Sequence, residues 1–170
     1  MPEIVFNKEA NTLDIKETGQ RFASLKPSLN MWLPDPDPEM NLDDAQHLFT
    51  IMMRTHEARF NTGERAAQAL STDDVGQMPE WKAENYADEE PTVYYCSASE
   101  TIRTMQNHMV MNNSNGSWQM DFDSGANEEV LLKAFTTFHL NAHERDTLSG
   151  DEFSDMIENC EEFELSPMKM

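Results

Sequence analysis

Hydrophobic and polar positions follow their clearest periodic patterns between residues 92 and 142. Trp118, Met120 and Phe122 alternate with polar residues, which is typical of a strand with one buried face. Apolar positions on both sides of this strand recur at helical spacing, and Asn-Gly before it favours a turn. The pattern predicts a strand at 92–97, a helix at 99–111, a strand at 117–123 and a helix at 127–142.

The N-terminal part of the chain has shorter and weaker patterns. Residues 3–6 and 12–15 predict two strands joined as a hairpin, because the polar stretch between them can turn the chain. Residues 22–32 have loosely spaced apolar positions and contain Pro27, so we expect an irregular segment there. The alternating prolines of residues 34–38 predict an extended connector.

Four more helical segments are predicted outside residues 92–142. Asn41 is a suitable N-cap, and Asp43 and Asp44 follow it in the first turn, where carboxylates favour the positive end of the helix dipole. This helix is expected to run to about residue 60, with a second piece at 64–70 and a short helix at 79–85. Ser149 and Glu152 form a capping box that starts the last helix. No internal repeat is evident from this pattern.

These elements predict an α+β fold. We expect a single compact domain with a small antiparallel sheet and several helices, helix-rich after residue 40, since 170 residues suffice for one well-packed core. The expected organisation is an N-terminal strand or hairpin segment at 1–33 packing on the main body, a Pro/Asp-rich connector at 34–40 and a main acidic domain at 41–165.

Charge constrains the partners of this chain. Its formal net charge is −20; residues 1–33 hold four acids and four bases, whereas residues 34–170 hold 28 acids and eight bases. Direct binding to nucleic acid or to an anionic membrane is therefore disfavoured, because no basic stripe is present to neutralise phosphates. A basic partner protein is favoured electrostatically.

The last predicted helix carries the most ordered acids. Asp151, Asp155, Glu158 and Glu162 step by four, three and four positions and would form one column on the helix surface. DNA carries a charge about every 1.7 Å along its axis, so a protein that imitates it needs carboxylates held on rigid elements. The residues expected to extend this partner-binding surface are Glu161, Asp43, Asp44, Asp73, Asp74, Asp88, Glu89 and Glu90.

Motifs that would indicate catalysis are weaker. His139 and His143 lie four positions apart, as two zinc ligands on one helix face do, but HExxH is absent and a helix-end pair is the simpler interpretation. Cys96 before a predicted helix resembles a nucleophile at a helix N-terminus, but its spacing to Arg103 does not match the phosphatase pattern. The acids at 121–128 lack the spacing of a calcium loop. We therefore expect no enzyme activity, no resident metal and no cofactor.

The two cysteines form no CxxC pair and the N-terminus lacks a signal-peptide pattern, which indicates a cytoplasmic protein, in a host cell if the chain is viral. In charge and size the chain resembles the small acidic inhibitors of phages and mobile elements, although no stretch identifies a family. The resulting prediction is an acidic protein-binding inhibitor, a nucleic-acid mimic that occludes the basic groove of a host defence or DNA/RNA-processing protein. Two alternatives stay open: a structural or assembly protein that forms homo-oligomers, such as a phage component, and a metal-dependent hydrolase.

Overall fold

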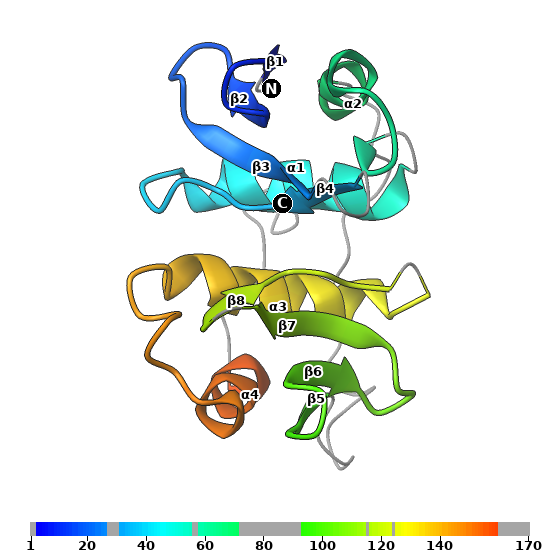
Figure 1. Cartoon of the computed structure of the whole chain (residues 1–170), viewed down its shortest axis with the longest axis vertical. Coiled ribbons are helices and arrows are strands. Elements are labelled where there is room, and N and C mark those ends of the chain that lie inside the picture. Colours follow the sequence, from blue (N-terminus) through cyan, green and yellow to red (C-terminus); the bar gives the residue numbers. More distant parts are fainter. Residues whose placement is uncertain are drawn as a thin grey trace, which may run out of the picture. The chain divides into compact units, whose positions relative to one another are not determined.

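The computed structural model describes residues 3–26, 31–55, 58–71, 93–114, 116–123 and 125–159. The chain divides into two compact units, residues 1–78 and 79–170. Within the described residues, each unit contains one antiparallel sheet of four strands and two helices (Figure 1).

The sheet of the first unit is a meander in which each strand pairs with the next. Its strands are β1 (Ile4–Asn7), β2 (Thr12–Ile15), β3 (Arg21–Lys26) and β4 (Met31–Pro34). Leu13 and Ile15 are buried on one face of β2. Asn11 precedes β2 at φ 56°, a conformation that asparagine adopts more readily than most residues.

Two helices complete the first unit: α1 (Leu42–Arg54) and α2 (Gly63–Leu70). The Asn41 side chain accepts a hydrogen bond from the Asp44 amide, so the predicted N-cap is confirmed. The Thr62 hydroxyl caps α2 in the same way. Helix α2 packs beside β1 and β2. The largest fully buried side chains of this unit are Trp32, Phe22, Phe49, Leu13, Leu48, Ile51, Met52 and Leu70.

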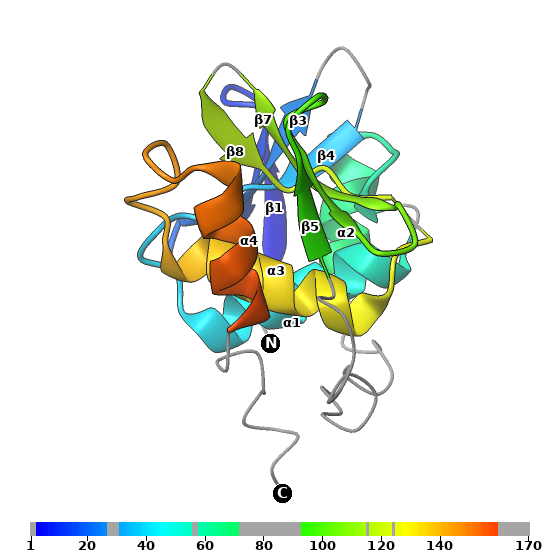
Figure 2. The same ribbon diagram turned by 90° about the horizontal axis from the view of Figure 1, so that it is seen from below.

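The second unit has the same order of elements. Its strands are β5 (Val93–Cys96), β6 (Thr101–Thr104), β7 (Met109–Ser114) and β8 (Ser117–Gln119), and its helices are α3 (Glu128–Leu140) and α4 (Gly150–Glu158). Helix α4 packs on β5, as Figure 2 shows from below. The predicted capping box is confirmed: the Ser149 hydroxyl accepts from the Glu152 amide, and the Glu152 carboxylate accepts from the Ser149 amide.

The α+β class is confirmed, but several elements differ from the sequence-based prediction. The strand expected at 117–123 ends at Gln119, and the helix expected to run to about residue 60 ends at Arg54. The expected helix at 99–111 is wrong, because this stretch forms β6, a turn and the start of β7. Its apolar residues have a spacing that suits both structures: Ile102 pairs across the ladder with Met111, and Val110 is buried as well. The segment expected to be irregular at 22–32 instead contributes to β3 and β4.

Residues 34–40 lie within the first unit. The Asp35 amide donates to the Phe22 carbonyl at 2.7 Å, and the Asp37 amide donates to the Arg21 carbonyl at 2.8 Å. Pro36 between them is buried. These bonds tie the proline-rich stretch to β3, and the division between the two units lies at residues 78 and 79 rather than inside the predicted connector.

None of the helices in the described ranges is both long enough and apolar enough to cross a membrane.

Candidate functional site

The predicted acidic surface is placed only in part by the structure. Asp43 is exposed in the first turn of α1, and Asp44 next to it is half-exposed. Asp151 and Asp155 are exposed on α4. No ion pair in the described part of the chain involves any of these four carboxylates, which leaves them accessible to a basic partner.

Glu158 has a different role from that expected of a column member. Its Oε2 accepts a hydrogen bond from the Val93 amide at 2.8 Å, and its side chain is half-buried. The backbone carbonyl of Glu158 accepts from Nζ of Lys133 at 2.9 Å. Glu158 therefore fastens the end of α4 to β5 and α3, and the exposed column on the described helix reduces to Asp151 and Asp155.

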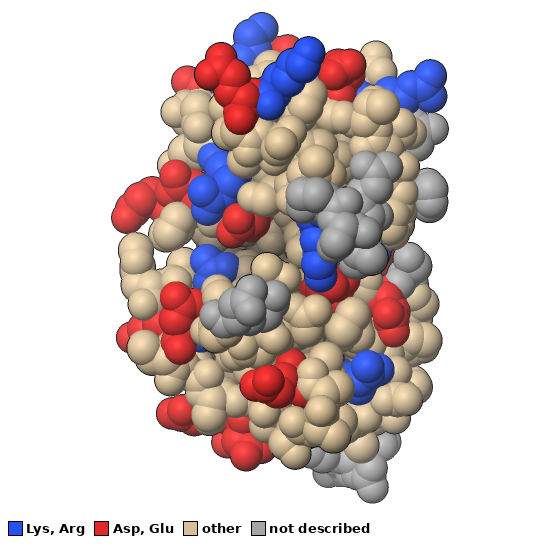
Figure 3. Space-filling model, viewed as in Figure 1, with Lys and Arg blue, Asp and Glu red and all other residues tan. Residues whose placement is uncertain are grey.

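The remaining predicted site residues lie outside the described residues. These are Asp73, Asp74, Asp88, Glu89, Glu90, Glu161 and Glu162. On the face of the molecule in Figure 3, acidic side chains are spread among uncharged surface rather than gathered into one continuous patch.

The imbalance of charge is concentrated in the second unit. Residues 79–170 hold 19 acids and five bases, a net charge of −14 out of the total of −20. The three bases within its described part serve its own fold: Lys133 is buried, Arg145 lies 3.8 Å from the ring centroid of Phe138, and Arg103 binds the β6–β7 hairpin. The basic residues in the described part of this unit are therefore committed to structural contacts.

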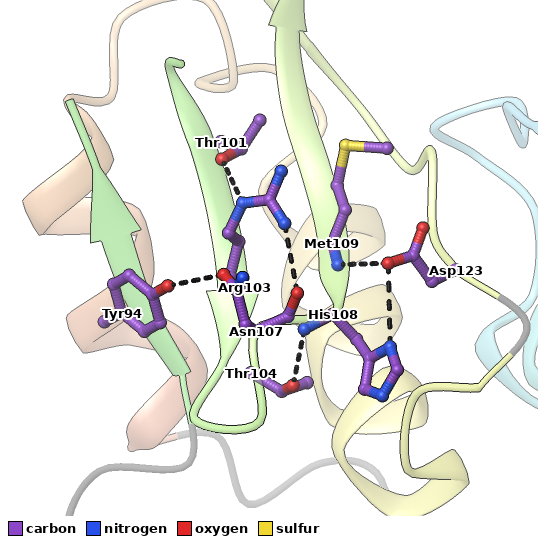
Figure 4. Close-up of polar contacts among 8 residues, drawn as sticks. All are labelled: Tyr94, Thr101, Arg103, Thr104, Asn107, His108, Met109 and Asp123. Atoms are coloured by element: carbon purple, nitrogen blue, oxygen red, sulfur yellow. Dashed lines mark hydrogen bonds and ion pairs between the residues drawn. The ribbon is translucent and has the colours of Figure 1, made fainter. Parts of the chain in front are cut away.

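A polar cluster that the sequence analysis missed lies on this hairpin (Figure 4). Tyr94 donates its hydroxyl to Oδ1 of Asn107 at 2.9 Å. Arg103 donates from Nε to Oγ1 of Thr101 and from Nη1 to the Asn107 carbonyl, both at 3.1 Å. Asn107 has φ 71°, so these bonds hold a strained turn in place.

The same hairpin is joined to the segment after β8. Oδ2 of Asp123 accepts from the Met109 amide at 2.9 Å and lies 3.7 Å from Nδ1 of His108. The imidazole and the carboxylate are each nearly half-exposed. Asp123 thus bonds to the backbone of Met109 at the start of β7, where a neighbouring strand would otherwise do so. The contacts of this cluster hold the β6–β7 hairpin and the segment after β8 in place. The cluster could not be predicted from the expected helix at 99–111, because its residues come together only when this stretch forms two strands and a turn.

Cys96 ends β5, and a turn follows it instead of the expected helix, so no helix N-terminus stabilises its thiolate. Hydrogen bonds from the side chain and the backbone of Ser99 nevertheless lower the pKa of the Cys96 thiol from its ordinary value, with a smaller contribution from the charge of Arg103. The side chain is half-exposed.

The candidate metal ligands are separated by the end of a helix. His139 is buried in α3 and stacks on Phe135 with ring centroids 6.3 Å apart, whereas His143 is exposed beyond Leu140, where α3 ends. Polar residues of the 121–128 stretch serve local structure: Asn127 caps α3, and Asp121 accepts from the Asn112 amide group. No group of three or more His, Cys, Asp or Glu in the described ranges is arranged to hold a metal ion.

Comparison of this chain with protein-family models, with curated proteins and with solved structures finds no match.

Proposed function

We propose that this protein is an acidic binding protein that occupies the basic nucleic-acid-binding groove of another protein and thereby inhibits it. The observation that carries the proposal is the exposed pair Asp151 and Asp155 on α4, in a unit of net charge −14. Such a protein acts by occlusion and has no catalytic residues. The proposed setting is a host cytoplasm, and the proposed origin is a phage or another mobile element whose target is a defence or DNA/RNA-processing complex.

The helix that holds these carboxylates is firmly anchored, which a charge mimic needs. Phe153 and Ile157 on its inner face are fully buried, and both halves of the capping box fix its first turn. Its last turn is held through Glu158. Carboxylates on an ordered helix meet a basic groove without the loss of conformational freedom that a disordered acidic tail would undergo on binding.

Electrostatic binding of this kind has a defined dependence on salt. Carboxylates that replace phosphates against Lys and Arg release the counterions of both surfaces, so affinity falls steeply as ionic strength rises. Nucleic acid should compete for the same basic side chains. Salt sensitivity and competition together distinguish occlusion of a groove from binding elsewhere on the partner.

The proposal is tested by capturing a partner from a host lysate and measuring its affinity for the protein at several salt concentrations. We expect Asp151→Asn with Asp155→Asn to weaken binding and to reduce the slope of log affinity against log salt. The matched control is Glu9→Gln with Glu17→Gln, which removes two exposed charges from the electrically neutral N-terminal segment. Equal effects of the two double variants, or binding that does not change with salt, would contradict the proposal.

A further inference from the structure

The two units share more than their order of elements. In both, strands follow one another as an antiparallel meander, and the second strand carries an irregularity of register, between Leu13 and Asp14 in one unit and between Ile102 and Arg103 in the other. The residue before the second strand has positive φ in both, 56° at Asn11 and 53° at Glu100.

An aromatic contact recurs between the first and the fourth strand. Phe6 and Trp32 pack edge to face with centroids 5.9 Å apart, and Tyr95 and Trp118 do so at 6.2 Å. In both units the indole then donates from Nε1 to the backbone carbonyl two residues before the short helix. The acceptors are Asn61, at 3.0 Å, and Leu148, at 3.1 Å.

A glycine is required at the same point of both units. Gly63 and Gly150 are the first residues of α2 and α4, and a Cβ at either position would overlap the ring of the first-strand aromatic, Phe6 or Tyr95. The absence of a side chain is what lets each short helix approach its sheet.

The first strand is fastened to the end of the short helix by one hydrogen bond in each unit. The Ile4 amide donates to Oγ of Ser71 at 2.9 Å, and the Val93 amide donates to Oε2 of Glu158 at 2.8 Å. Ser71 directly follows α2, and Glu158 is the last residue of α4. The residues differ in type, but they satisfy the same backbone donor.

The long helices correspond residue by residue. Both are capped by an asparagine, Asn41 or Asn127. A buried Phe-Thr pair follows at the same distance in each, and the threonine hydroxyl bonds the carbonyl four residues earlier. Read back from the cap, both segments have the spacing Trp-x-x-Asp-x-Asp-x-x-x-Asn, which starts at Trp32 in one unit and at Trp118 in the other.

We infer that the chain is a tandem repeat of one structural module, and that residues 4–71 and 93–158 are its two copies. Two unrelated units could share the topology of a four-stranded meander followed by two helices. That topology alone does not require an aromatic ring packed over the first glycine of a helix, nor a hydrogen bond from an indole to one particular carbonyl. These contacts are made by corresponding residues in both units, with only small changes of offset along the chain, as two copies of one sequence would leave them.

Because the two copies correspond, the charges on α4 can be compared with those at the same positions of α2. Where α2 and its C-cap have Arg65, Gln68 and Ser71, α4 has Glu152, Asp155 and Glu158 at the corresponding positions. Glu152 and Glu158 make structural contacts of α4, through the capping box and the bond to Val93, whereas the Asp155 carboxylate makes no ion pair within the described residues. Asp151 corresponds to Glu64, which is also an acid, so Asp155 is the member of the exposed pair that the first copy lacks. Resting on the proposed function, this assigns the partner-binding role to the second copy.

Indole proton exchange in the full chain tests the repeat. Trp32 and Trp118 are buried, and each indole is hydrogen-bonded, so both protons should exchange slowly; their NMR signals are assigned with Trp32→Phe and Trp118→Phe. We expect Gly63→Val to speed exchange at Trp32 at least tenfold and to leave Trp118 unchanged, and Gly150→Val to do the reverse. If either glycine variant affected both indoles or neither, the repeat would be contradicted.

A second experiment tests whether residues of the first copy can replace those of the second, and it does not depend on the glycine variants. Glu152→Arg, Asp155→Gln and Glu158→Ser place the corresponding residues of the first copy into α4. We expect the Trp118 indole to keep its slow exchange within about tenfold, because the Ser149 hydroxyl still caps the helix and a serine already holds the first strand in the other copy. Loss of that protection would overturn the repeat. Binding of the captured partner is measured separately: retained protection with undiminished binding would refute only the assignment to the second copy, and absence of any partner would refute only the proposed function.

Discussion

Truncation of Phe153 should destabilise the second unit alone. This side chain is fully buried on α4, and its ring packs against Trp118 with centroids 5.7 Å apart at 65°. Phe→Ala changes in protein cores cost about 3–5 kcal/mol, and an edge-to-face pair contributes about 1 kcal/mol of such a loss. We expect Phe153→Ala to lower the free energy of unfolding of residues 79–170 by about 4 kcal/mol.

Amide hydrogen exchange measured by peptide-resolved mass spectrometry reads this effect in each unit separately. A loss of about 4 kcal/mol should speed exchange of the slowest β7 amides roughly a thousandfold, because every 1.4 kcal/mol is a factor of about ten. Amides of β3 in the first unit should not change. The control is Asp155→Ala, at an exposed position of the same helix, for which we expect a change within about 0.5 kcal/mol.

Two results would refute this reasoning. A loss below about 1 kcal/mol would mean that Phe153 is not enclosed between α4 and the sheet. Equal acceleration in β3 and β7 would mean that the two units unfold as one.

The remaining predictions concern a cap, a thiol and a buried lysine contact. Ser149→Ala should cost about 1 kcal/mol in urea unfolding, since it removes the hydroxyl that accepts from the Glu152 amide; Ser154→Ala on the same helix is the control, and equal losses would be contrary to the cap. In a Cys160→Ser background, alkylation of Cys96 by iodoacetamide should reach half its maximal rate below the pH of a free thiol, because Ser99 lowers the pKa of Cys96 and reactivity follows the thiolate. Ser99→Ala should move that midpoint to higher pH, because it removes the hydroxyl and keeps the backbone N–H, and an unmoved midpoint would exclude the Ser99 hydroxyl as a cause. Lys133→Ala should speed exchange at the end of α4 more than at its capped start, because Nζ holds the Glu158 carbonyl; uniform exchange along α4 would argue against this anchor.

Local signals predicted those elements whose stability is decided locally. The N-cap at Asn41 and the capping box at Ser149 depend on residues three positions apart, so the sequence indicates them directly. The alternation of Trp118 and its neighbours likewise marks β8. Helices α2 and α3 were predicted to within two residues of their observed ends for the same reason, whereas α1 ends at Arg54 and not near residue 60.

The prediction failed where pairing across the sheet decides the structure. Ser99 looks like a helix cap, and residues 102–110 have helical spacing, but Thr101, Ile102 and Thr104 are β-branched and the Asn107 turn allows β6 to pair with β7. The structural role of Glu158 could not be predicted for the same reason, since its hydrogen bond to Val93 joins residues far apart in the chain. Few corresponding residues of the two copies are identical, so the pattern of hydrophobic and polar positions does not indicate the repeat. The spacing shared after Trp32 and Trp118 is its signal in the sequence.

Capture of a partner from a host lysate tests the central claim most directly. The tagged protein is immobilised at low salt, and the bound material is divided between elution with rising salt and elution with duplex DNA. The account predicts that both release the same nucleic-acid-binding protein or complex, and that the variant with Asp151→Asn and Asp155→Asn captures much less of it. Capture that DNA does not reverse, or that the variant retains in full, would contradict the claim that these carboxylates occupy a basic nucleic-acid-binding groove.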